Sequence, residues 1–192
     1  MPAATKTMTL DEFLELPETE PASEFVCGRI IPRPMPTWFH SRLANRIGAF
    51  FEFYFMKHDE GYANVELRYA AREEGRSYLP DVSVTRWDKA PRTLGERRKG
   101  AIEVLPDLAV EISSPEDRPT RIADKLTFYL RAGVPLVWIV DADDRTVSAY
   151  TPGQPPKVFS AGDVLDASPV LSEFALPVSD LFSALDKHVQ EP

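Results

Sequence analysis

The chain has almost no cysteine and no long apolar run, and both absences narrow its class. Cys27 is the only cysteine among 192 residues, which excludes an intrachain disulfide and favours a reducing compartment. The longest apolar stretches, such as residues 136–140, fall far short of the roughly 18 to 20 residues that cross a bilayer. The N-terminus also lacks the basic and then apolar stretches of a secretory signal. We therefore expect a cytoplasmic protein without a membrane span.

Positive charges are fewer than negative ones. The chain carries 22 Lys and Arg against 30 Asp and Glu, a net charge of −8, so any contact with nucleic acid must be local. In residues 89–99 the positive charges outnumber the negative ones, and we call this stretch the basic loop. Its cationic residues are Lys89, Arg92, Arg97, Arg98 and Lys99. Two interpretations stay open, a loop that contacts phosphates and an ordinary solvated surface loop.

The remaining composition is that of a globular protein, with 43% hydrophobic and 10% aromatic residues. We expect a single domain over residues 1–192, with a core over about 20–151 and further strands and a helix over 152–192. Apolar residues spaced three and four apart predict helices at 40–58 and 117–132. Shorter apolar runs predict strands near 62–69, 80–86, 108–113 and 136–141. This order of elements predicts an α/β fold.

Two carboxylates occupy matching positions in two of these apolar runs. Asp81 lies in the run over 79–84, and Glu111 lies in the run over 107–112. A charge within such a run is costly to bury unless something pairs with it. Lys125, in the helix predicted after the second run, is placed to reach back toward both acids. Two acids on neighbouring strands with a nearby lysine indicate a divalent-metal phosphodiesterase site.

Each of these residue types suits that chemistry. Mg²⁺ prefers hard oxygen ligands and usually takes one or two protein carboxylates, so Asp81 and Glu111 suffice as metal ligands, and we expect Mn²⁺ to substitute for Mg²⁺. A bound ion polarises the phosphate and activates a coordinated water. Lys125 would position or help to deprotonate that water and offset the charge of the phosphorane. The alternative is an ordinary ion pair between Lys125 and Glu111.

Four stretches of the sequence, taken in order, resemble one known family. They are PDVSV at 80–84, PDLAVEISSP at 106–115, DKLTFY at 124–129 and AGVPLVWIVD at 132–141. Over roughly residues 20–151 the chain resembles the Uma-type restriction endonucleases of the PD-(D/E)XK nuclease superfamily. The resemblance implies a restriction-endonuclease-like α/β fold, in which a central mixed sheet of about five strands is flanked by helices and followed by a C-terminal β addition.

The resemblance also implies roles for single residues. Asp81 falls on the first acid of the family's motif and Glu111 on the second. The lysine that usually stands two residues after the second acid is Ser113 here, and the resemblance implies that Lys125 has taken over its role.

Glu24 and His40 also match positions of the family, and two readings stay open for each. Glu24 either supports the metal site or forms a salt bridge at a strand edge. His40 either touches substrate or water near the metal, or only begins the long helix.

The function expected from these residues is that of a Mg²⁺-dependent endonuclease, a hydrolase of phosphodiester bonds in DNA. The alternative is a non-catalytic nucleic-acid-binding or regulatory protein that keeps the nuclease fold, which the displaced lysine and the negative net charge favour. A phosphoesterase for small nucleotides is a third candidate. The sequence also allows a homodimer.

Overall fold

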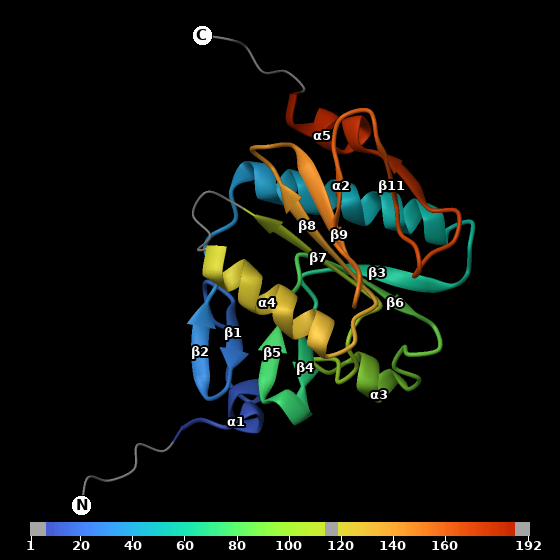
Figure 1. The fold of residues 1–192 in the computed structure, drawn as a ribbon. Helices are drawn as coiled ribbons and strands as arrows, with labels where there is room; N and C mark the ends of the chain where they lie inside the picture. The colour runs from blue at the N-terminus through green and yellow to red at the C-terminus, as the bar shows by residue number, and fades with distance from the viewer. Residues whose placement is uncertain (1–6, 114–118, 187–192) are drawn as a thin grey trace, which may run out of the picture.

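The structure, a computed structural model, describes residues 7–113 and 119–186 (Figure 1). Its helices are α1 (Leu10–Leu14), α2 (Trp38–Phe55), α3 (Leu94–Arg97), α4 (Pro119–Arg131) and α5 (Val178–Asp186), with a 3-10 turn, η1 (Arg72–Glu74). Its strands are β1 (Ser23–Val26), β2 (Arg29–Pro32), β3 (Gly61–Val65), β4 (Tyr69–Ala71), β5 (Arg76–Tyr78), β6 (Val82–Arg86), β7 (Leu108–Ser113), β8 (Leu136–Asp141), β9 (Thr146–Tyr150), β10 (Lys157–Phe159), β11 (Val164–Asp166) and β12 (Ala175–Pro177).

A mixed sheet in the order β10-β9-β8-β7-β6-β3 forms the centre of the fold. Its one parallel pair within the described residues is β7 with β8, and the other neighbours are antiparallel. A parallel pair needs a crossover connection, and the segment that contains α4 makes it. A smaller sheet has the order β2-β1-β5-β4, and β11 pairs with β12. The predicted α/β fold with a central mixed sheet is confirmed, with six strands in that sheet instead of about five.

The two faces of the central sheet are covered by different helices. Val110 and Ile112 of β7 pack in a core cluster with α2, whereas Ala109 packs with Tyr129 of α4. Helices α2 and α4 accordingly lie on opposite sides of β7 and β8 (Figure 1). Because successive side chains of a strand point to opposite faces, Glu111 points to the side of α4.

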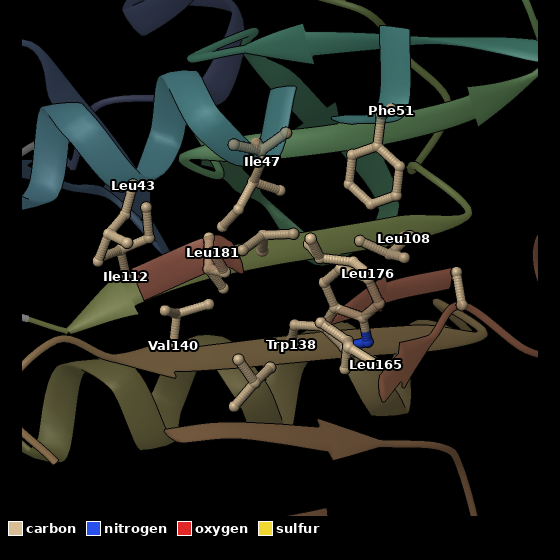
Figure 2. Close-up of a cluster of buried hydrophobic side chains, with 14 of the residues drawn as sticks. Leu43, Ile47, Phe51, Leu108, Ile112, Trp138, Val140, Leu165, Leu176 and Leu181 are labelled. Atoms are coloured by element: carbon tan, nitrogen blue, oxygen red, sulfur yellow. The ribbon is translucent and has the colours of Figure 1, made fainter. Parts of the chain in front are cut away.

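The larger core lies between the sheet, α2 and the C-terminal segment. Figure 2 shows Leu43, Ile47 and Phe51 of α2 beside Leu108, Ile112, Trp138, Val140, Leu165, Leu176 and Leu181. The last three residues belong to the region expected as a C-terminal addition. That region therefore shares the main core, and β10 extends the central sheet. The boundaries of a single domain stay a prediction.

Local backbone signals explain how the N-terminal region reaches the sheet. Strands β1 and β2 form a tight hairpin whose corner, Cys27 and Gly28, has φ angles of 46° and 87°. Two positive φ angles are typical of a type I′ hairpin turn. The chain then enters α2, whose N-terminus is capped by the Thr37 side chain. This path brings Glu24, Arg33 and His40 toward the start of β6.

Three predicted elements differ in detail. The strand predicted over 62–69 is two strands in different sheets, because the backbone turns at Glu66, where φ is 54°. The basic loop contains the short helix α3, which begins with a capping box formed by Thr93 and Glu96. The helix predicted over 117–132 is α4, and its predicted first residue, Asp117, lies outside the described residues. Within the described ranges, no helix is long and apolar enough to cross a bilayer.

Candidate active site

Asp81 is a buried carboxylate at the start of β6. Its backbone N–H donates to the carbonyl of Val110 at 3.0 Å, which places it against β7. Its Oδ2 accepts the backbone N–H of Ile112 at 2.7 Å and lies 3.1 Å from Nε2 of His40, while its Oδ1 contacts the guanidinium of Arg33. Every one of these neighbours favours the ionised form of Asp81.

The charges of Asp81 and His40 support one another. Burial alone would raise the pKa of Asp81, but the bond to His40 and the charge of Arg33 bring it below the ordinary value. Burial alone would lower the pKa of His40, but the bond to Asp81 raises it above the ordinary value. We infer an ionised Asp81 beside a His40 that favours the imidazolium form. His40 is therefore a partner of Asp81 as well as a residue in the first turn of α2.

Glu111 is the second buried carboxylate. Its Oε2 lies 2.5 Å from Nζ of Lys125, and its Oε1 accepts the hydroxyl of Tyr129 at 2.9 Å. Burial raises the pKa of Glu111 to about 7, with Asp81 and Glu24 adding to the rise and Lys125 opposing it. The carboxyl group of Glu111 can therefore gain or lose a proton near neutral pH.

Lys125 projects from α4 into the same pocket and is buried. Its Nζ contacts Glu111 and also Oε1 of Glu24 at 2.8 Å. Burial lowers the pKa of Lys125, but the charges of Glu111, Glu24 and Asp81 raise it more, so it favours the ammonium form. Its partners among the described residues are thus Glu111 and Glu24, whereas Asp81 has Arg33 and His40 at contact distance.

Glu24 lies inside the site and is 1% exposed. Its Oε2 lies 2.8 Å from Nη2 of Arg121, while its other oxygen contacts Lys125. Burial would raise the pKa of Glu24, but Lys125 and Arg121 together bring it below the ordinary value. Of the two readings of Glu24, the salt bridge is present, but it lies deep in the site instead of at a strand edge.

Two cations of the site had no role in the sequence analysis. Arg33 follows β2 and joins Asp81 to Glu66, whose Oε1 is 3.3 Å from its Nη1. Arg121 on α4 joins Glu24 to the carbonyl of Pro32 at 2.9 Å. The only local signal for Arg33 in the sequence is its position between two prolines. That pattern does not reveal which acid the arginine contacts.

These side chains surround one pocket of about 170 Å³. Its charged and titratable lining residues are Arg33, His40, Glu66, Asp81, Glu111, Arg121 and Lys125. The structure thus brings together all three residues that the sequence singled out as catalytic. Tyr129 of α4 also belongs to this site, because its hydroxyl donates a hydrogen bond to Glu111.

The donor set fits a hard divalent cation of the Mg²⁺ type. Asp81 and Glu111 supply carboxylate oxygens in one pocket, and the charge of Asp81 helps to raise the pKa of Glu111, so the two acids are close enough to repel. Within residues 7–113 and 119–186, no group of three His, Cys, Asp or Glu residues forms a complete metal centre. Two carboxylates with waters and substrate oxygens are the usual environment of Mg²⁺, so the residues present are sufficient.

Comparison with known proteins places the chain in a family. The model of the Uma2 family, described as "Putative restriction endonuclease", matches residues 10–179. The chain belongs to the Uma2 family. The family and the fold together indicate a nuclease of the restriction-endonuclease type.

A solved structure supports the same assignment. It is the crystal structure of a protein from Anabaena variabilis described as "a putative nuclease belonging to DUF820". The two chains are 35% identical, with a TM-score of 0.84, and the similarity covers 93% of this chain and 99% of the other. No curated protein matches the chain.

Proposed function

We propose that this Uma2 protein is a divalent-metal-dependent endonuclease that hydrolyses phosphodiester bonds in DNA. Asp81 and Glu111 are the proposed metal ligands, and Lys125 is the proposed catalytic cation. One observation carries the proposal: two buried carboxylates from neighbouring strands β6 and β7 line a single pocket with a buried lysine. Burying this many charged side chains costs stability. A role in phosphoryl chemistry would explain why they are buried here.

The metal would be held by Asp81 and Glu111, with water and phosphate oxygens completing its shell. When bound, such an ion polarises a phosphate and lowers the pKa of a coordinated water. Mg²⁺ is the proposed ion, and Mn²⁺ should substitute for it, because both accept carboxylate and water ligands. His40 supports this role by holding Asp81 in its ionised form.

Lys125 would stabilise the negative charge that develops on the phosphate and orient the attacking water. Its contacts with Glu111 and Glu24 hold the ammonium in one place at the wall of the pocket. A fixed charge in a site that excludes water is most effective, because little reorganisation is needed during the reaction. Glu24 and Tyr129 are proposed as positioning residues, the first for Lys125 and the second for Glu111.

DNA is the proposed substrate, and the basic loop is its proposed contact. Among the described residues, Lys89 pairs with Asp107 at 2.6 Å, and Lys99 lies 3.9 Å from Glu103. The exposed residues Arg92, Arg97 and Arg98 form no ion pair with a carboxylate in the described part of the chain, although Nε of Arg97 donates to the carbonyl of Pro91 at 2.9 Å. Their charges are therefore the most available to phosphates.

The second candidate is a nucleic-acid-binding protein without catalysis. One observation favours it: every acid in the pocket already has a cation or hydrogen-bond donor of this chain as a partner. In such a protein, the network would only hold the fold together. Metal-dependent stabilisation separates the two candidates, because an ion that binds only the folded state raises the melting temperature by mass action.

The direct test is DNA cleavage by the wild type, Asp81→Asn and Glu111→Gln, each with Mg²⁺, with Mn²⁺ and with EDTA. The proposal predicts cleavage by the wild type with either metal, and loss of cleavage in EDTA and in both variants. Melting curves and a DNA-binding assay show whether each variant stays folded and binds. DNA binding without cleavage and without metal stabilisation in the wild type would support the second candidate.

A further inference from the structure

Arg33 and the proposed metal compete for the same oxygen of Asp81. Oδ2 of Asp81 already receives the N–H of Ile112 at 2.7 Å and lies 3.1 Å from Nε2 of His40. Oδ1 contacts Arg33 alone among the described residues. A cation that binds Asp81 must therefore use Oδ1, and it must displace the guanidinium to do so.

The side chain of Arg33 can move away from Asp81 without disturbing the fold. Its backbone is held, because its N–H donates to the carbonyl of Ala22 at 2.8 Å. Its side chain bridges Asp81 to Glu66, and the Glu66 side chain is half exposed. The guanidinium can therefore move within the pocket while the hairpin and α2 stay in place.

Arg121 provides a contrast within the same pocket. It carries the same charge, but it joins Glu24 to the carbonyl of Pro32, and no contact with Asp81 is present in the described residues. Both arginines oppose a bound cation by repulsion. Arg33 also occupies the ligand oxygen itself.

We propose that Arg33 holds the cation position on Asp81 in the metal-free protein and transfers to the substrate phosphate when a divalent cation binds. This inference rests on the proposed function and assigns Arg33 as a residue that binds the substrate phosphate within it. A guanidinium presents N–H groups in a planar fork that matches a phosphate as well as a carboxylate. Because Arg33 lines the pocket, the released side chain stays within reach of a phosphate bound there.

The proposal predicts that metal and nucleic acid bind cooperatively. A phosphate that attracts Arg33 frees Oδ1 of Asp81 for the metal, and a metal on Asp81 frees Arg33 for the phosphate. Such coupling must be equal in both directions. A protein without Arg33 should bind metal more tightly and should lose the coupling.

The test is Mn²⁺ affinity, measured from the electron paramagnetic resonance signal of free Mn²⁺. The full-length wild type, Arg33→Gln and Arg121→Gln are titrated alone and with a short phosphorothioate DNA duplex, which resists cleavage. We expect Arg33→Gln to bind Mn²⁺ about 10-fold more tightly than the wild type, within the roughly 5- to 150-fold range of typical couplings. The duplex should tighten Mn²⁺ binding by the wild type and have little effect on Arg33→Gln. Arg121→Gln, the charge-matched control, should show a smaller gain and keep the effect of the duplex.

Each outcome decides something different. Equal Mn²⁺ affinity of the wild type and Arg33→Gln, or an equal gain in Arg121→Gln, would overturn the role of Arg33 and leave the proposed metal site standing. Absence of Mn²⁺ binding in the wild type and in both variants would overturn the metal site, and this inference with it. If Arg33→Gln does not fold, Arg33→Met serves instead, since methionine keeps an unbranched side chain but has no charge and no donor to occupy Oδ1 of Asp81. A Mn²⁺ affinity no tighter than that of the wild type would then contradict the proposal.

Discussion

Nζ of Lys125 lies 2.5 Å from Oε2 of Glu111, and both side chains are almost fully buried. The same contact is expected for an ordinary ion pair and for a catalytic lysine beside a metal ligand. A second acid, Glu24, shares the same ammonium, so the contact belongs to a buried network of three charged residues, and the catalytic role of Lys125 stays a proposal. We propose that Glu111, which shares this lysine with Glu24, can still bind a cation through its carboxylate.

Replacing Lys125 by Met should abolish cleavage and also destabilise the metal-free protein. The change leaves Glu24 and Glu111 without their shared cation, and breaking a buried pair typically costs about 3 to 5 kcal/mol. Urea unfolding and DNA cleavage measure the two effects. Arg131→Met on the same helix is the control, because its pair with Glu74 is exposed and such pairs contribute about 0 to 1 kcal/mol. Normal cleavage by Lys125→Met would remove the lysine from the mechanism.

Tyr129→Phe should lower the free energy of unfolding while leaving the core packed. The variant loses only the hydroxyl that donates to Oε1 of Glu111 at 2.9 Å. Hydrogen bonds to charged groups contribute about 1.5 to 3 kcal/mol, so a loss of about that size is expected above pH 7, where Glu111 is ionised. Urea unfolding of both proteins in EDTA measures it. Unchanged stability would show that the hydroxyl does not support the carboxylate.

The raised pKa of Glu111 predicts how the metal-free protein responds to pH. Burial raises this pKa from 4.5 to about 7, so between these values the folded protein holds a proton that the unfolded chain has released. The stability that this proton contributes is fully present below the unfolded pKa and is lost as the pH rises through the folded pKa. We therefore compare the melting temperatures of the wild type and Glu111→Gln in EDTA. The difference, wild type minus variant, should decrease as the pH rises from about 5 to about 8. A difference that rises over this range would contradict the raised pKa.

The basic loop should determine how DNA affinity depends on salt. Each phosphate neutralised contributes a slope of about −0.9 to the plot of log affinity against log salt. The double substitution of Arg97 and Arg98 by Ala should reduce the slope by about two contacts and leave any sequence preference unchanged. Replacing Arg145 and Lys157, which pair with Asp186 and Asp166 away from the pocket, is the charge-matched control. Equal slopes in the two double variants would make the basic loop an ordinary surface.

The elements of the fold were predictable because their signals are local. Apolar spacing predicted α2 and α4, and apolar runs predicted β6, β7 and β8 within a few residues. The same runs revealed Asp81 and Glu111, since an acid in an apolar run is conspicuous. The order of the strands and the division of the region near Glu66 into two sheets depend on packing between distant segments, which spacing does not record.

The rest of the site was hidden for the same reason. Arg33 lies 48 residues before Asp81, and Arg121 lies 97 residues after Glu24. Nothing local to either arginine distinguishes it from a surface cation. The contacts exist only after the β1–β2 hairpin and α4 have packed around the start of β6.

The central claim is that Asp81 and Glu111 hold one divalent cation between them. A crystal structure of the protein with Mn²⁺, located by its anomalous scattering, tests this most directly. The account predicts a Mn²⁺ ion at about 2.1 Å from one carboxylate oxygen of each residue, with the guanidinium of Arg33 moved off Asp81. No anomalous peak in the pocket at saturating Mn²⁺, with Arg33 still on Asp81, would contradict it.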